Sequence, residues 1–146
     1  MNKEIIKLSQ ISKKFLGNKK DITVLKNINL KIKMGDLVSL TGPSGSGKST
    51  LLHIIALLDQ PTTGEIFFRN KNFSKSSEVE KDSIRRKGIS IIYQQHNLLS
   101  DFTALENVMI PLLNIGFSWN ESLNKAKKTL SLVSLSKRFD HFPSEL

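Results

Sequence analysis

The 146-residue sequence contains no cysteine, which excludes a disulfide framework, a thiolate metal site and a cysteine nucleophile. It also has no apolar run of membrane-spanning length. Leu51–Leu58 contains His53 and stops at Asp59, far short of the roughly 18 residues that a spanning helix requires. The N-terminus lacks the basic and apolar regions of a signal peptide, so we expect the protein to stay in the cytoplasm.

Acidic residues are scarce: 13 Asp and Glu stand against 22 Lys and Arg, a formal net charge of +9. Such a surplus can serve nucleic-acid binding, because Lys and Arg neutralise phosphates. The aromatic residues are few, however, and lack the spacing of a base-stacking platform. The basic residues form scattered pairs at Lys13–Lys14, Lys19–Lys20, Arg85–Arg86, Lys127–Lys128 and Lys137–Arg138. We therefore expect no nucleic-acid partner, and a basic surface that faces phosphates, a membrane or a partner protein.

Hydrophobic residues make up 38% of the chain, and their spacing predicts an α/β fold. Segments 3–11 and 23–32 predict strands of a small antiparallel layer, and the apolar run 37–40 predicts a strand buried on both faces of a parallel sheet. The pattern then predicts a helix at 48–58, a strand at 65–69, a helix at 76–87 and a strand at 89–93.

Two capping boxes predict the starts of two further helices. In each box a hydroxyl residue is followed three positions later by a glutamate, at Thr103 with Glu106 and at Ser118 with Glu121. The side chains of such a pair satisfy backbone amides that a helix start leaves without partners. We expect an amphipathic helix after each box.

The strongest chemical signal is a glycine-rich stretch between the 37–40 run and the helix predicted at 48–58. It matches the P-loop pattern G-x-x-x-x-G-K-[ST] and lies between a predicted strand and helix, as that motif requires. Its glycines let backbone N–H groups wrap phosphates, Lys48 supplies charge to the β- and γ-phosphates, and the Ser49 hydroxyl is placed to ligate Mg²⁺. We assign phosphate binding to Gly42, Pro43, Ser44, Gly45, Ser46, Gly47, Lys48, Ser49 and Thr50. Nucleotide kinases and transport ATPases share this motif.

The wider sequence resembles the ATP-binding subunits of ABC transporters, and three further segments carry the resemblance. Phe15 ends the first predicted strand, where the family has an aromatic residue that stacks on adenine; a core phenylalanine is the alternative. Gly64–Arg69 resembles the turn and strand beyond the P-loop helix. Ile91–Gln94 resembles the Q-loop, whose glutamine, here Gln94, reaches Mg²⁺ and the attacking water and couples the site to membrane subunits. A surface amide without a role is the alternative for Gln94.

A nucleotide kinase is the enzymatic alternative, since guanylate kinases carry a similar loop, but their loop opens the chain and here a β-layer precedes it. Within the ABC family, Asp101–Val108 and Leu51–Ile55 resemble the lipoprotein-releasing ATPases, with macrolide-export and cell-division relatives close behind. Ala56 and Ser100 depart from the usual pattern. The resemblance implies ATP and Mg²⁺ as ligands, catalytic roles for Lys48 and Gln94, and Mg²⁺ contacts from Ser49 and Gln94.

The same resemblance implies partners and a location. Transmembrane permease subunits and a second ATP-binding subunit are the expected partners, and lipoprotein release at the cytoplasmic face of the inner membrane is the expected role. The implied fold is an α/β P-loop ATPase with an antiparallel β-layer at 1–35, a P-loop core at 36–95 and the start of a helical subdomain at 96–146.

The chain stops at Leu146, where the family continues into a Ser-Gly-Gly signature loop. We therefore expect an incomplete parallel core sheet, without the signature, the strand ending in Asp-Glu or the switch histidine. His53, His96 and His141 suit capping or packed positions better than catalytic ones. The resemblance then implies weak nucleotide binding with negligible hydrolysis, and a non-hydrolysing nucleotide-binding fragment is the alternative function.

Overall fold

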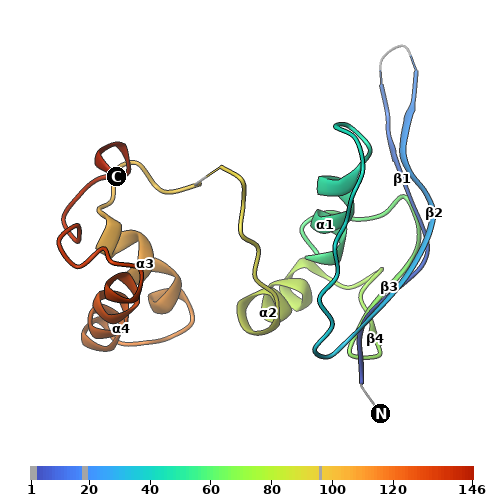
Figure 1. The fold of residues 1–146 in the computed structure, drawn as a ribbon. Coiled ribbons are helices and arrows are strands. Elements are labelled where there is room, and N and C mark those ends of the chain that lie inside the picture. The colour runs from blue at the N-terminus through green and yellow to red at the C-terminus, as the bar shows by residue number, and fades with distance from the viewer. Residues whose placement is uncertain (1–2, 18–19, 96) are drawn as a thin grey trace. The chain divides into compact units, whose positions relative to one another are not determined.

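The computed structural model describes residues 3–17, 20–95 and 97–146, so Lys19 and His96 of the sequence analysis lie outside the described residues. The chain forms two compact units, which we call the first unit (Met1–Ile91) and the second unit (Ile92–Leu146). The first unit contains the sheet and two helices, and the second contains a helical hairpin (Figure 1).

The sheet of the first unit is antiparallel and has the strand order β2-β1-β3-β4. Its strands are β1 (Glu4–Phe15), β2 (Ile22–Lys33), β3 (Thr63–Phe68) and β4 (Lys71–Asn72). The central strand β1 pairs on both sides: Leu8 lies opposite Leu30 of β2 and opposite Ile66 of β3. The predicted strands at 3–11, 23–32 and 65–69 are therefore confirmed.

One face of this sheet carries the core of the first unit. The inward residues Leu8 and Ile11 of β1 and Ile66 of β3 pack against Leu51 and Ile54 of helix α1 (Lys48–Ile55). All five are buried, and Figure 1 shows α1 beside that face of the strands. Burial of these apolar side chains fixes the helix against the sheet.

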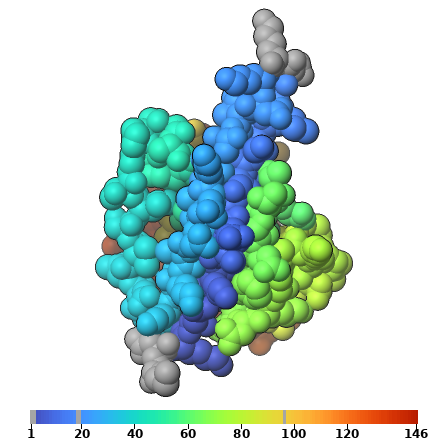
Figure 2. All heavy atoms as spheres, turned by 90° about the vertical axis from the view of Figure 1, so that its right-hand side faces the viewer, coloured from blue at the N-terminus to red at the C-terminus, as the bar shows by residue number. Residues whose placement is uncertain are grey.

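The opposite face of the sheet is visible in Figure 2, where β2, β1 and β3 lie side by side. Lys7 of β1 and Phe67 of β3 are cross-strand partners, and the Lys7 ammonium lies 5.1 Å from the centre of the Phe67 ring. Such a pair combines apolar contact with a cation–π attraction.

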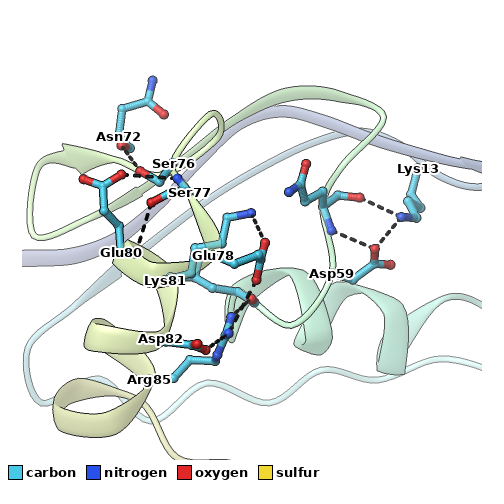
Figure 3. A network of polar contacts seen from close by, with 12 residues as sticks. Lys13, Asp59, Asn72, Ser76, Ser77, Glu78, Glu80, Lys81, Asp82 and Arg85 are labelled. Atoms are coloured by element: carbon cyan, nitrogen blue, oxygen red, sulfur yellow. Dashed lines mark hydrogen bonds and ion pairs between the residues drawn. The ribbon is translucent and has the colours of Figure 1, made fainter.

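Helix α2 (Glu78–Gly88) confirms the helix predicted at 76–87. Ser77 caps it through a full capping box with Glu80, which the sequence analysis did not single out. The Lys81 side chain is only 3% exposed, and its ammonium lies 2.8 Å from Glu78 Oε1 (Figure 3). A buried cation is retained at low cost only when it is paired in this way.

The second unit is built on helices α3 (Ala104–Asn114) and α4 (Trp119–Leu132), which confirm the two predicted capping boxes. Met109, Ala126 and Leu130 are among its buried residues. The segment that leads to the short 3-10 helix η1 (Pro143–Glu145) crosses the start of α3. There the His141 carbonyl accepts from Ala104 N at 2.8 Å, and the Phe139 carbonyl accepts from Leu105 N at 3.0 Å.

Every helix in the described part of the chain falls short of the length and apolar character that crossing a bilayer demands.

The strands predicted at 37–40 and 89–93 are wrong: both segments run as loop, and the described residues contain no parallel pairing. A strand needs a neighbour that accepts and donates backbone hydrogen bonds, and none lies beside these segments in the described sheet. Leu37 is fully exposed, and Val38 and Leu40 are also exposed. The apolar run 37–40 indicates that the segment tends to be buried. Its sequence does not show which other segment would cover it.

Candidate functional site

The glycine-rich loop leads directly into α1. Gly42, Gly45 and Gly47 all have positive φ angles, of 154°, 78° and 89°. Gly47 is the N-cap of α1, so the first turn of the helix presents its backbone N–H groups to the loop. The loop from Gly42 to Ser46 is exposed. An exposed glycine-rich turn at a helix N-terminus suits an anion.

Lys48 begins α1, and its side chain folds back over the loop. The ammonium donates to the Gly42 carbonyl at 2.8 Å and to the Pro43 carbonyl at 2.7 Å. The positive charge is therefore held at the loop, and the phosphates of a ligand would compete with these two carbonyls for it. Ser49 follows with an exposed side chain, and Thr50 is half-buried.

The helix that carries this loop is held at its N-terminal end by the sheet. An ideal Cβ at Gly47 would lie 2.9 Å from both Val24 Cγ1 and the Val24 carbonyl oxygen, and 3.0 Å from Leu25 Cδ2. The loop therefore packs on β2 with no room for a side chain.

The C-terminal end of α1 is held by two cationic side chains. Leu57 turns the chain with a left-handed φ of 59°, which ends the helix earlier than the predicted 58. The Arg85 guanidinium donates to the Leu57 carbonyl and also binds Asp82 (Figure 3). Lys13 forms an ion pair with Asp59 in the turn that follows. Both side chains therefore hold the turn that follows the helix.

Phe15 is the last residue of β1 and pairs with Ile22. Phe15 is 45% exposed, so it does not belong to the buried core of the first unit as the structure describes it. The Lys13 ammonium lies 5.1 Å from the centre of the Phe15 ring. The ring is thus accessible for stacking and has a cation on one face.

Gln94 belongs to the second unit, whereas Phe15 and the residues from Gly42 to Thr50 belong to the first. Its side chain is exposed in an open hollow that is also lined by Tyr93, Gln95, Asn97 and Leu98. The structure therefore brings the phosphate-loop residues together and leaves the metal contact of Gln94 a prediction.

Two of the histidines, His53 and His141, lie in the described residues. His53 is within α1. The His141 backbone carbonyl accepts from Ala104 N at the start of α3, and the ring Nε2 of His141 lies 2.8 Å from Arg138 Nη1.

The sequence analysis did not identify Lys13 and Arg85 as the residues that hold the turn after α1. Lys13 and Asp59 lie 46 positions apart in the sequence. A contact over that separation cannot be read from a local sequence pattern. A weak signal was present, because Lys13 and Phe15 are two positions apart on a strand and therefore share one face.

Known proteins of similar sequence and fold point to the same kind of site as the geometry of the glycine-rich loop. The ABC transporter family model matches residues 25–146. The chain is 44% identical over 145 residues to the lipoprotein-releasing system ATP-binding protein LolD of Wigglesworthia glossinidia brevipalpis, covering 99% of this chain and 63% of that protein. It is 42% identical over 147 residues to LolD of Francisella tularensis subsp. tularensis, covering 100% and 64%. The chain thus spans less than two thirds of the length of these relatives.

The fold is similar to solved structures at comparable identity. A dimeric post-hydrolysis state of the ATP-binding cassette MJ0796, bound to ADP and Pi, aligns with a TM-score of 0.90 and 40% identity, over 97% of this chain and 63% of that one. A second dimeric structure of MJ0796, a bacterial ABC transporter cassette, aligns with a TM-score of 0.89 and 42% identity. The predicted fold class is therefore confirmed. With a P-loop at the start of α1 and relatives that match nearly all of its length, the chain belongs to the ABC transporter family.

Proposed function

We propose that this chain binds ATP and Mg²⁺ as part of the ATP-binding subunit of an ABC transporter that powers lipoprotein release. The observation that carries the proposal is the geometry of residues 42–50, which we call the phosphate loop. Its glycines have positive φ angles, Lys48 is the first residue of α1, and the Lys48 ammonium lies over the loop. Three sources of positive charge meet there: a cationic side chain, the backbone N–H groups of the loop and the N-terminal end of a helix dipole.

The residues present have the chemistry that a magnesium nucleotide needs. Backbone N–H groups of the loop would hold phosphate oxygens, and Lys48 would exchange its two carbonyl partners for them. The Ser49 hydroxyl is the proposed Mg²⁺ ligand in the loop, Gln94 is a further proposed Mg²⁺ contact, and Phe15 is the proposed support for the adenine. A Mg²⁺ ion held by these residues would supply positive charge that offsets the charge of the phosphates.

The role in lipoprotein release rests on the relatives at 42–44% identity that carry that name. We propose transmembrane permease subunits as partners, a peripheral position on the cytoplasmic face of the inner membrane, and pairing with a second ATP-binding subunit. The dimeric cassette MJ0796, which is bound to ADP and Pi, supports the pairing. Co-purification with permease subunits from solubilised inner membranes tests the partners, and recovery of the chain without them contradicts that part of the proposal.

The nucleotide site is tested by the affinity of the chain for MgATP, measured by isothermal titration calorimetry. We expect Lys48→Ala to weaken binding about tenfold to a hundredfold, because a charge-assisted hydrogen bond to phosphate is lost. Lys26→Ala is the matched control, since Lys26 is an exposed lysine on β2 outside the loop, and it should bind like the original chain. Unchanged affinity in Lys48→Ala would refute the site.

A further inference from the structure

We propose that Lys13 is a positioning residue for Phe15, and that it joins the base-binding end of β1 to the turn that follows the P-loop helix. The inference rests on the proposed function, because Phe15 supports a base only if the chain binds a nucleotide.

The Lys13 ammonium has three partners at once. It lies 2.6 Å from Asp59 Oδ1, 2.7 Å from the Gln60 carbonyl oxygen and 5.1 Å from the centre of the Phe15 ring. Figure 3 shows the Lys13 side chain pointing toward Asp59. The side chain is only 13% exposed, whereas most lysine ammonium groups extend into water. A lysine so enclosed has exchanged its hydration for these contacts.

The acceptors for Lys13 are themselves fixed. Gln60 N donates to Asp59 Oδ1 at 2.7 Å, so the carboxylate is held by its own turn. Thr62 N donates to the Ser12 carbonyl at 2.8 Å, and the Thr62 hydroxyl accepts from Lys14 N at 2.9 Å. The turn after α1 is therefore tied to β1 on both sides of Lys13, and the lysine enters a site that is already formed.

This arrangement has a direct consequence for the ring. Phe15 is the last residue of β1 and is 45% exposed, so its neighbours alone restrain it little. The ammonium, fixed by Asp59 and Gln60, holds one face of the ring by cation–π attraction, and a base then stacks on the other face. Without Lys13, part of the binding free energy would be spent on ordering the ring.

The same contact links the two halves of a nucleotide site. Asp59 and Gln60 follow α1, and α1 begins at the phosphate loop. Lys13 thus sets the base support against the helix that carries the phosphates, and it should matter only for ligands that have a base.

The test compares the affinities of the chain for MgATP and for magnesium tripolyphosphate, which has the phosphates but no base. We expect Lys13→Met, which keeps the aliphatic stem, to bind MgATP about tenfold more weakly, a loss within the range of one base–aromatic stack. Its affinity for tripolyphosphate should be unchanged. Lys13→Arg should restore most of the loss, because a guanidinium can bind both oxygens.

Lys14→Met is the matched control, since it removes the same charge one position along, where the side chain is exposed and only the backbone contacts Thr62. It should leave both affinities unchanged. Asp59→Asn provides a second variant that keeps an acceptor for Gln60 N, and it should show the same base-specific loss as Lys13→Met.

Several results would overturn the inference, and they differ in what they imply. If Phe15→Ala loses the preference for ATP over tripolyphosphate but Lys13→Met and Asp59→Asn keep it, Lys13 does not position the ring and the proposed function stands. Equal weakening toward both ligands in the two variants would show a general structural role. If the original chain itself shows no preference for ATP, the base-binding role of Phe15 fails together with this inference.

Discussion

Gly47 is the residue at which the phosphate loop meets the sheet. Its φ is 89°, a conformation that side chains rarely adopt, and the position where a Cβ would lie is only 2.9 Å from atoms of Val24. Any side chain would have to push the start of α1 away from β2. The glycine is therefore required for packing, apart from the contact with phosphate that we propose for it.

We expect Gly47→Ala to lower the free energy of unfolding by about 2–4 kcal/mol, because backbone strain and the collision with Val24 add. Urea denaturation followed by circular dichroism measures the change. Gly35→Ala is the control: Gly35 has a φ of 86°, but an added Cβ would meet nothing within 4 Å. There we expect a loss of only about 1 kcal/mol. Equal losses would show that the contact with Val24 is unimportant.

The elements differ in how far sequence alone predicts them. The helices after Thr103 and Ser118 were predicted correctly, because a capping box is formed by residues three positions apart. The strands at 37–40 and 89–93 were not, because pairing depends on a neighbour elsewhere in the chain. The same distinction between local and distant contacts holds for the candidate site. Its loop is contiguous and was predicted, whereas the contact between Lys13 and Asp59 spans 46 positions and was not.

The capping boxes also make helix stability depend on pH. In α3, backbone and side-chain hydrogen bonds from Thr103 hold the pKa of Glu106 below its ordinary value of 4.5. Since the folded pKa is lower than the unfolded one, the stabilisation is complete above the ordinary value. It is lost as the pH falls through the lowered value.

We therefore expect Glu106→Gln to lose less stability than the original chain as the pH is lowered from about 5 to 3, because its cap does not titrate. Urea midpoints followed by helical circular dichroism measure the difference. At neutral pH, Thr103→Val should cost about 1 kcal/mol through loss of the cap, and Thr103→Ser should cost little. A pH dependence in Glu106→Gln as steep as in the original chain would contradict the assignment.

At the scale of the whole molecule, apolar side chains are exposed in a described segment that belongs to no strand. Leu37, Val38 and Leu40 are all exposed in a loop that lies outside the described sheet. Exposed apolar segments of this kind pair readily with other chains. The loop that precedes Gly42 is thus the region from which self-association should begin.

We expect Leu37→Lys to shift the protein toward monomer, as measured by sedimentation velocity over a range of protein concentrations. A charge at the centre of the exposed run opposes pairing of like segments. Leu132→Lys is the matched control, because Leu132 is also highly exposed but ends α4 in the second unit. Equal effects of the two variants would assign association to general surface hydrophobicity, and monomeric behaviour of the original chain would refute the prediction.

The central position of β1 affects the order of events during synthesis. β1 is made before both of the strands that it pairs with, and β2 emerges next to cover one of its edges. Its other edge pairs with β3, which begins only at Thr63, after the phosphate loop and all of α1 have left the ribosome. The sheet therefore closes late and over a long separation in sequence, which is slow. Until then the growing chain carries a half-paired strand, and a chaperone that shields strand edges would act in this interval.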